Sequence, residues 1–240
     1  MKLSSLTIGK VLSPSFLLAA GLMSAFLPTN ASANAVSGVA NIGGTVDVST
    51  SGIFFFNTLD TTANIFDAGV GTNSYAGLSG GTIQNLLGPP TVGPVSLTDF
   101  ITFNATIGSI FFDLQSISAG TGTVAGCGSN AIGSVCTPAG SPFTLTQTDA
   151  GVSITLTLHG IAYTGTAVSG ASPTGGLFTA QVTVPGTISG VLAQVVAPGG
   201  LQDQTYSATF TSVPVPEPAT FGLIGAALLG LGVLRRRVRS

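Results

Sequence analysis

The sequence predicts an all-β body, folded as an antiparallel β-sandwich or a jelly-roll-like domain and flanked by two targeting segments. Residues 36–212 are rich in glycine, serine, threonine and valine and poor in charged residues. Apolar and polar residues alternate with a period of two in several runs, which is the pattern of half-buried strands. Turn residues separate these runs at intervals of roughly ten residues, a spacing typical of sandwich and jelly-roll folds.

The first element, residues 1–35, has the pattern of a secretory signal peptide. Lys2 and Lys10 supply the positive region, and the apolar stretch runs from Val11 to Leu27. Small residues follow this stretch, as they do before a signal-peptidase cleavage site. We therefore expect the Sec machinery to export the chain.

Two positions fit the cleavage site, because Ala33 and Ala35 each end a run of small residues with alanine two positions earlier. We favour cleavage after Ala35, which makes Val36 the first residue of the mature protein. An uncleaved N-terminal anchor is the alternative. Pro28 and the polar residues behind it argue against that alternative.

Within the body, alternating or wholly apolar runs predict strands, and one run with a helical period predicts a short helix. We expect strands over 53–56, 95–105, 110–114, 143–148, 152–158, 178–184 and 205–211, and a helix over 188–196. Asp149-Ala150-Gly151 suits a hairpin turn. A β-bulge near Asp99 would let that carboxylate leave the core. No internal repeat and no linker divides the body.

The charges are distributed unevenly along the chain. All six lysine and arginine residues lie in the two end segments, so residues 36–213 hold seven aspartates and no basic residue except His159. With His159 neutral, these seven aspartates give the body a formal charge of −7. Without lysine or arginine, the body cannot neutralise phosphates, which excludes binding to nucleic acid and to anionic lipid surfaces.

Cys127 and Cys136 are the only cysteines, and they lie nine positions apart in a glycine- and serine-rich stretch. An even pair at this spacing in an exported chain predicts a disulfide that closes a small loop. The chain-entropy model gives such a loop a stabilisation of roughly 2–3 kcal/mol. Half of a metal site is the alternative, but it would need further ligands.

The sequence contains no arrangement that indicates catalysis, and we expect no cofactor and no enzyme activity. His159 falls on the polar face of its strand, and no serine lies in a nucleophile-elbow motif. Asp60 and Asp67 are the only candidates for a Ca²⁺ site. Their segment lacks the dense oxygen ligands of a Ca²⁺ loop, so we expect solvated aspartates.

The C-terminal segment, residues 213–240, joins three pieces of different chemistry. A proline-spaced stretch comes first and favours an extended chain. The apolar run from Ala219 to Leu234 has 16 residues, about 24 Å as a helix, a little under the ~20 residues of a typical span. The segment ends in four arginines, which would keep this end cytoplasmic: Arg235, Arg236, Arg237 and Arg239. We expect a single transmembrane helix here.

Val215, Pro216, Glu217 and Pro218, followed by this apolar run and the arginine cluster, resemble the PEP-CTERM sorting signal. Such tails occur on exported proteins of Gram-negative bacteria that make extracellular polysaccharide. The resemblance implies that an exosortase-like enzyme of the inner membrane cleaves near Pro216-Glu217-Pro218. The body would then pass to the cell surface or the extracellular matrix. A membrane anchor that is never cut is the alternative.

These features lead to three hypotheses about function. The first is a surface or matrix protein with a structural or adhesive role in an exopolysaccharide layer or biofilm. The second is a carbohydrate-binding module on a β-sandwich, although the body has no tryptophan and only Tyr75, Tyr163 and Tyr206 as tyrosines. The third, an extracellular hydrolase, lacks a catalytic constellation.

Overall fold

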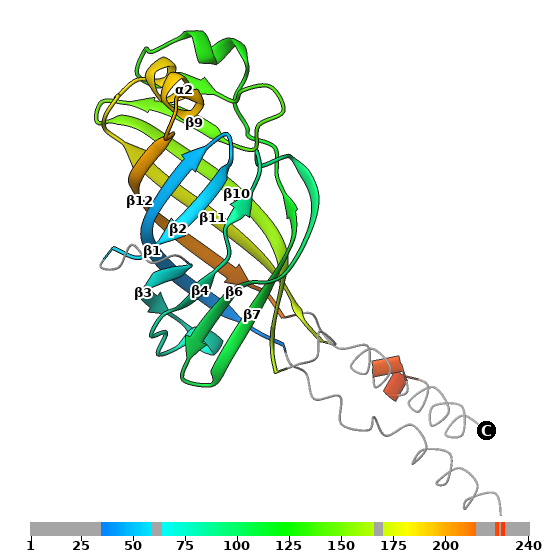
Figure 1. Ribbon diagram of the computed structural model, residues 1–240. Helices are drawn as coiled ribbons and strands as arrows, with labels where there is room; N and C mark the ends of the chain where they lie inside the picture. Colours follow the sequence, from blue (N-terminus) through cyan, green and yellow to red (C-terminus); the bar gives the residue numbers. More distant parts are fainter. Residues whose placement is uncertain (1–34, 59–63, 166–169, 215–223, 226, 229–240) are drawn as a thin grey trace, which may run out of the picture. The chain divides into compact units, whose positions relative to one another are not determined.

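The computed structural model describes residues 35–58, 64–165, 170–214, 224–225 and 227–228 (Figure 1). Ala33–Glu217 form one compact unit. Its strands are β1 (Gly38–Ser49), β2 (Gly52–Phe56), β3 (Ile65–Gly71), β4 (Gly81–Ile83), β5 (Leu86–Leu87), β6 (Gly93–Ala105), β7 (Gly108–Ile117), β8 (Val135–Cys136), β9 (Thr144–Thr148), β10 (Gly151–Thr164), β11 (Ser172–Val182) and β12 (Leu201–Ser212). Its helices are η1 (Asn73–Tyr75), η2 (Ala125–Gly128) and α2 (Ile188–Val196).

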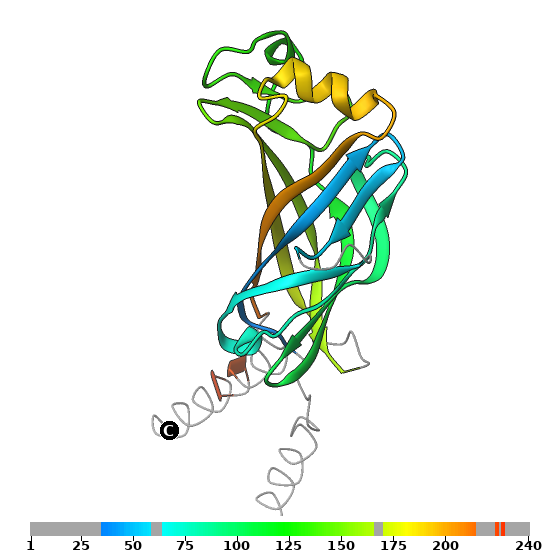
Figure 2. The same cartoon turned by 60° about the vertical axis from the view of Figure 1, so that its left-hand side comes forward.

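Eight of these strands form a closed antiparallel barrel (Figure 2). Their order around the ring is β11, β12, β1, β3, β4, β6, β7 and β10, and β10 pairs back with β11. The all-β antiparallel class expected from the sequence is confirmed. The expected sandwich is corrected, because one closed sheet takes the place of two packed sheets. Closure depends on the pairing of β10 with β7 through Tyr163 and Thr164, which alternation within a strand does not reveal.

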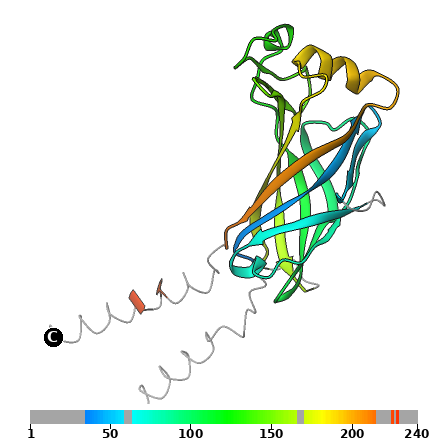
Figure 3. The same ribbon diagram turned by 90° about the vertical axis from the view of Figure 1, so that its left-hand side faces the viewer.

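The four remaining strands extend the wall at one end of the barrel. β2 pairs with the second half of β1, and β5 pairs with β2. β9 pairs with the first half of β10, and β8 pairs with β9. The helix α2 lies across this same end (Figures 1 and 3).

The barrel has an aromatic core. Phe103, Phe112 and Phe178 surround Phe210, with ring centroids 5.4, 5.3 and 5.6 Å from it and ring planes steeply inclined. Edge-to-face contacts of this kind add to the stabilisation from apolar burial. A second, smaller apolar cluster joins α2 to the end of the barrel through Ile188, Val191 and Leu201 with their neighbours.

Several local expectations are confirmed. β9 and β10 form the expected hairpin, with Thr148 opposite Gly151. The register of β6 against β7 shifts between Leu97 and Ile101, and Asp99 in this bulge is exposed with a φ of 50°. The helix over 188–196 has the expected bounds, and Thr187 caps it by accepting a hydrogen bond from the Gly190 backbone nitrogen. Strands β1, β3, β4, β5 and β8 were not expected from the sequence.

No helix in the described part of the chain is long and apolar enough to cross a membrane. The expected signal peptide lies outside the described residues except for Ala35. The expected transmembrane run over 219–234 also lies outside them, except for residues 224, 225, 227 and 228.

Candidate functional site

An apolar cavity of about 370 Å³ lies at the α2 end of the body. Inward-facing side chains of β1, β2 and β9–β12 form its walls, α2 covers it, and the loops around Pro89 and Pro138 form its rim. No charged side chain lines it. The lining includes Val46, Phe55, Leu156 and Phe178 from the strands, and Val191 and Leu192 from α2.

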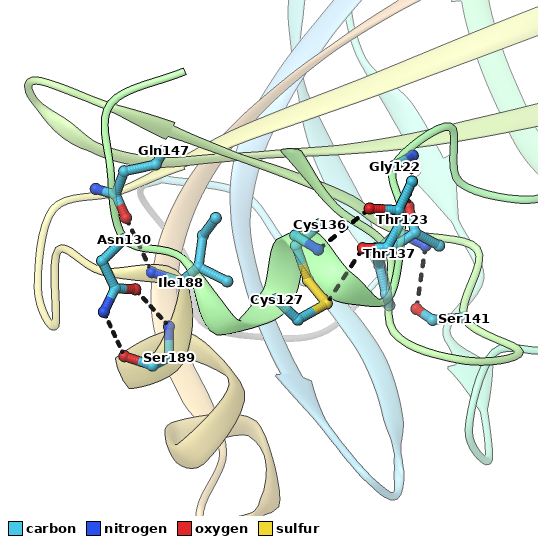
Figure 4. The surroundings of a disulfide bond; sticks show 12 residues. Gly122, Thr123, Cys127, Asn130, Cys136, Thr137, Ser141, Gln147, Ile188 and Ser189 are labelled. Atoms are coloured by element: carbon cyan, nitrogen blue, oxygen red, sulfur yellow. Dashed lines mark hydrogen bonds between the residues drawn. A yellow bond between two sulfur atoms is a disulfide. The ribbon is translucent and has the colours of Figure 1, made fainter. Parts of the chain in front are cut away.

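The disulfide between Cys127 and Cys136 confirms the expected pairing, and it lies near the start of α2 (Figure 4). The loop that it closes carries Asn130, whose side-chain Oδ1 accepts a hydrogen bond from the Ser189 backbone nitrogen at 3.2 Å. The Asn130 amide nitrogen donates to Ser189 Oγ at 3.0 Å. Asn130 thus satisfies a free N–H group in the first turn of α2.

Gln147 on β9 holds the same helix end from the barrel side (Figure 4). Its Oε1 accepts a hydrogen bond from the Ile188 backbone nitrogen at 3.0 Å. Its amide nitrogen donates to the backbone oxygens of Gly186 and Gly151 at 2.8 and 3.1 Å. The disulfide loop and the β9 strand therefore fix the start of α2 over the cavity.

Tyr206 is one of the few polar side chains in the cavity wall. Only 6% of its surface is exposed. Its hydroxyl oxygen is buried and has no hydrogen-bond partner among the described residues. Burial, followed by the Asp67 carboxylate, raises the pKa of this phenol. The hydroxyl therefore stays protonated and can donate or accept a hydrogen bond at physiological pH.

Tyr163 forms a second polar cluster, on the outside of the barrel seam between β7 and β10. Its hydroxyl donates to Asp99 Oδ1 and Asp113 Oδ1, each at 3.2 Å. The Asp99 backbone nitrogen also donates to Asp113 Oδ1 at 2.8 Å. Burial and the carboxylates of Asp113 and Asp99 raise the pKa of Tyr163. The cluster fixes the β-bulge that carries Asp99.

A buried polar chain lies at the barrel end away from α2. Tyr75 Oη and Thr174 Oγ1 lie 2.8 and 2.7 Å from Ser212 Oγ, and Thr174 Oγ1 donates to the Ser172 backbone oxygen. Burial raises the pKa of Tyr75 to about 12, against a smaller opposing effect of the Ser212 hydrogen bond. These hydroxyls satisfy one another and contain no acid or base that titrates near neutral pH.

The remaining candidates do not come together. His159 is exposed on β10, opposite Gly175 of β11. Asp67 Oδ2 accepts a hydrogen bond from the Thr58 backbone nitrogen, and Asp60 lies outside the described residues. Over the ranges that the structure describes, no three His, Cys, Asp or Glu side chains group as metal ligands would.

The expected sorting residues Val215–Pro218 and the four arginines lie outside the described residues. Residues 214–237 match the PEP-CTERM protein-sorting motif. The chain carries this sorting motif. The match includes Val215, Pro216, Glu217, Pro218 and the first three arginines, and it ends before Arg239. No curated protein and no solved structure matches the chain.

The PEP-CTERM motif indicates an exported protein that an exosortase-type membrane enzyme processes. This confirms the expected sorting motif and the exosortase-type enzyme that it implies. The body residues that fix α2 and line the cavity were not found from the sequence. Asn130 and Gln147 carried no signal, because one lies in a loop and the other on an alternating strand, both ordinary places for amides.

Proposed function

We propose that this chain is a non-enzymatic protein of the cell surface or extracellular matrix in a Gram-negative bacterium. Its role there is structural or adhesive, within an exopolysaccharide layer or biofilm. The PEP-CTERM motif at residues 214–237 carries this proposal, because it directs an exported body to exosortase-type processing. The disulfide supports the proposal, since such bonds persist in an oxidising compartment outside the cytoplasm.

We also propose that the body has no enzyme activity. Asp99 and Asp113 accept hydrogen bonds from the Tyr163 hydroxyl, and the Asp99 backbone nitrogen donates to Asp113. This cluster lies on the barrel exterior, away from the cavity. The cavity itself has an uncharged lining. The cavity therefore has no carboxylate or imidazole in its lining that could act as a general base.

The alternative of a carbohydrate-binding module receives less support from the structure. Sugar sites commonly use exposed aromatic rings as stacking platforms, yet Tyr75, Tyr163 and Tyr206 are all buried. The large apolar side chains that are exposed in the described residues are aliphatic. We therefore place the adhesive role before sugar recognition.

Changing Pro216 and Glu217 together to alanine should leave the full-length protein in the inner membrane. The proline–glutamate–proline segment is what the exosortase-type enzyme would read, and without it the tail stays attached. Cell fractionation with an intact mass measurement checks this. Pro198→Ala, in the exposed loop after α2, is the matched control and should be processed normally. Arrival of the double variant at the surface with wild-type mass would contradict the sorting proposal.

The packing of Val36 leads us to replace the cleavage after Ala35 that the sequence favours by cleavage after Ala33, which makes Asn34 the first residue of the mature chain. Val36 has no exposed surface, and its backbone nitrogen donates to Ser172 Oγ at 2.8 Å. Cleavage after Ala35 would turn this nitrogen into an ammonium group at a buried position, which is costly. It would also remove the bridge between Ala35 and Tyr163.

N-terminal sequencing of the exported protein checks this expectation. A mature chain starting at Val36 would contradict it and would favour the other small-residue site. The product that starts at Asn34 is longer by Asn34 and Ala35 than the one that starts at Val36. An intact mass measurement therefore distinguishes the two independently.

A further inference from the structure

The cavity beneath α2 has the size of a binding site for a small molecule. Its volume of about 370 Å³ lies within the range of roughly 300–1,000 Å³ that is usual for ligand pockets. Close packing normally leaves few voids larger than a water molecule inside a protein. Hydrogen bonds from Gln147 and Asn130 fix the first turn of α2 above this space. Because the helix is held there, side-chain packing does not fill the cavity.

The walls select for an apolar molecule. Aliphatic and aromatic side chains of the strands face Val191, Leu192 and Val195 of α2 across the cavity. The polar residues of the lining gather mainly at the rim, including Ser49, Thr91 and Ser141. Apolar surface on both sides favours a hydrocarbon chain over water.

The charges of the body exclude an anionic ligand head. Residues 36–213 contain no lysine or arginine to pair with one, and no charged side chain lines the cavity. The negative charge of Asp67 also acts on Tyr206 in the cavity wall, where it helps to raise the pKa of the phenol. An unpaired charge buried here would be costly, so the ligand must be neutral.

Tyr206 contributes its ring to the cavity wall. Its ring packs against Phe55 and Phe178, with centroid distances of 5.6 Å to each, and its hydroxyl lies beside Gly44 without a partner. This hydroxyl is enclosed by protein atoms, so the cavity presents the tyrosine ring and not its oxygen to a ligand.

We propose that this cavity binds an uncharged single-chain amphiphile, a molecule with one hydrocarbon chain and a hydroxyl or ester group. The chain lies between α2 and the strands, and the polar group lies at the rim, beside the hydroxyl side chains of Thr91 and Ser141. This binding site is independent of the sorting of the protein to the surface.

The test uses the exported protein purified without detergent and the uncharged fluorescent dye Nile red. We expect Nile red to bind with a rise in fluorescence and 1-decanol to displace it. Decanoate at pH 8 has a similar chain but a negative charge, and it should displace the dye at least tenfold less effectively. No binding of Nile red, or equal displacement by decanol and decanoate, would overturn the proposal.

Two matched substitutions test whether the dye binds in the cavity. Ala180→Leu adds volume at a wall position and should lower the affinity for Nile red about tenfold or more without lowering the melting temperature. Ala193→Leu makes the same change on the exposed side of α2 and should leave binding unchanged. Equal losses in the two variants would place the dye elsewhere and would refute the site.

Tyr206→Phe tests where the polar group of the ligand lies. Removing an unpartnered hydroxyl should raise the melting temperature of the ligand-free protein slightly. The affinity for 1-decanol should stay unchanged, because the enclosed hydroxyl does not reach the ligand. A loss of affinity of about fivefold or more, the size expected for one lost hydrogen bond, would overturn the placement of the polar group at the rim.

Discussion

Phe210→Ala should lower the free energy of unfolding by about 3–5 kcal/mol. Phe210 has no exposed surface, and its ring contacts the rings of Phe103, Phe112 and Phe178 from three other strands. Alanine would leave a cavity that β-strands fixed on both sides cannot fill by collapsing. Since domains of this size are stable by only ~5–15 kcal/mol, the variant should lose a large part of its stability.

Urea unfolding followed by circular dichroism measures this loss as a shift of the midpoint. Phe111→Ala is the matched control, because Phe111 is half-buried and stacks on Tyr163 outside this cluster. Its loss should be less than half as large. Equal shifts for the two variants would show that the cluster around Phe210 does not dominate the stability of the core.

Gly160→Ala should destabilise the barrel by an amount near the upper end of the ~1–3 kcal/mol typical of overpacked cores. A Cβ at Gly160 would overlap the backbone oxygen of Asp113 and lie 2.8 Å from the Phe112 ring carbon Cε2. Backbone cannot rotate away as a flexible side chain can. β10 would have to move from β7, and the pairing of these two strands closes the ring.

Gly175→Ala provides the control on the neighbouring strand. The nearest atom to a Cβ at Gly175 is His159 Nδ1, at 4.0 Å. We expect no loss of stability from this change. Melting temperatures of both variants, measured by calorimetry, distinguish the positions, and a normal melting temperature for Gly160→Ala would contradict the close approach of β10 to β7.

The sequence predicts those parts of the fold that depend on neighbours along the chain. The β9–β10 hairpin follows from two alternating runs around a turn, and the helix α2 follows from apolar residues at a helical period. The bulge at Asp99 follows from one polar residue that interrupts an apolar face. Each of these signals is contained within about 15 residues.

β1 was missed because Gly43 and Gly44 interrupt its alternation. Gly44 is inward-facing and lies beneath the Tyr206 side chain, so the position that weakens the strand pattern is needed for packing. Closure into a barrel was missed for a different reason. A period of two says which side chains face inward, and the same pattern suits two packed sheets or one closed sheet.

The candidate site was predictable in part. The disulfide followed from the number and spacing of cysteines, and the sorting motif followed from three chemically distinct pieces in order. The cavity did not, because it arises where α2 is held above the strands by Asn130 and Gln147. These contacts join residues 41 to 59 positions apart, and nothing in a single sequence records such pairs.

The antiparallel pairing of β1 with β12 gives the body a direction. Gly38 is opposite Ser212, so the chain enters and leaves the barrel at one end, while Leu201 and Tyr206 of β12 reach the cavity at the other. The length of β12, roughly 35–40 Å, separates the two ends. The two ends of the body therefore differ in kind, because the chain enters and leaves at one end and the apolar cavity lies at the other.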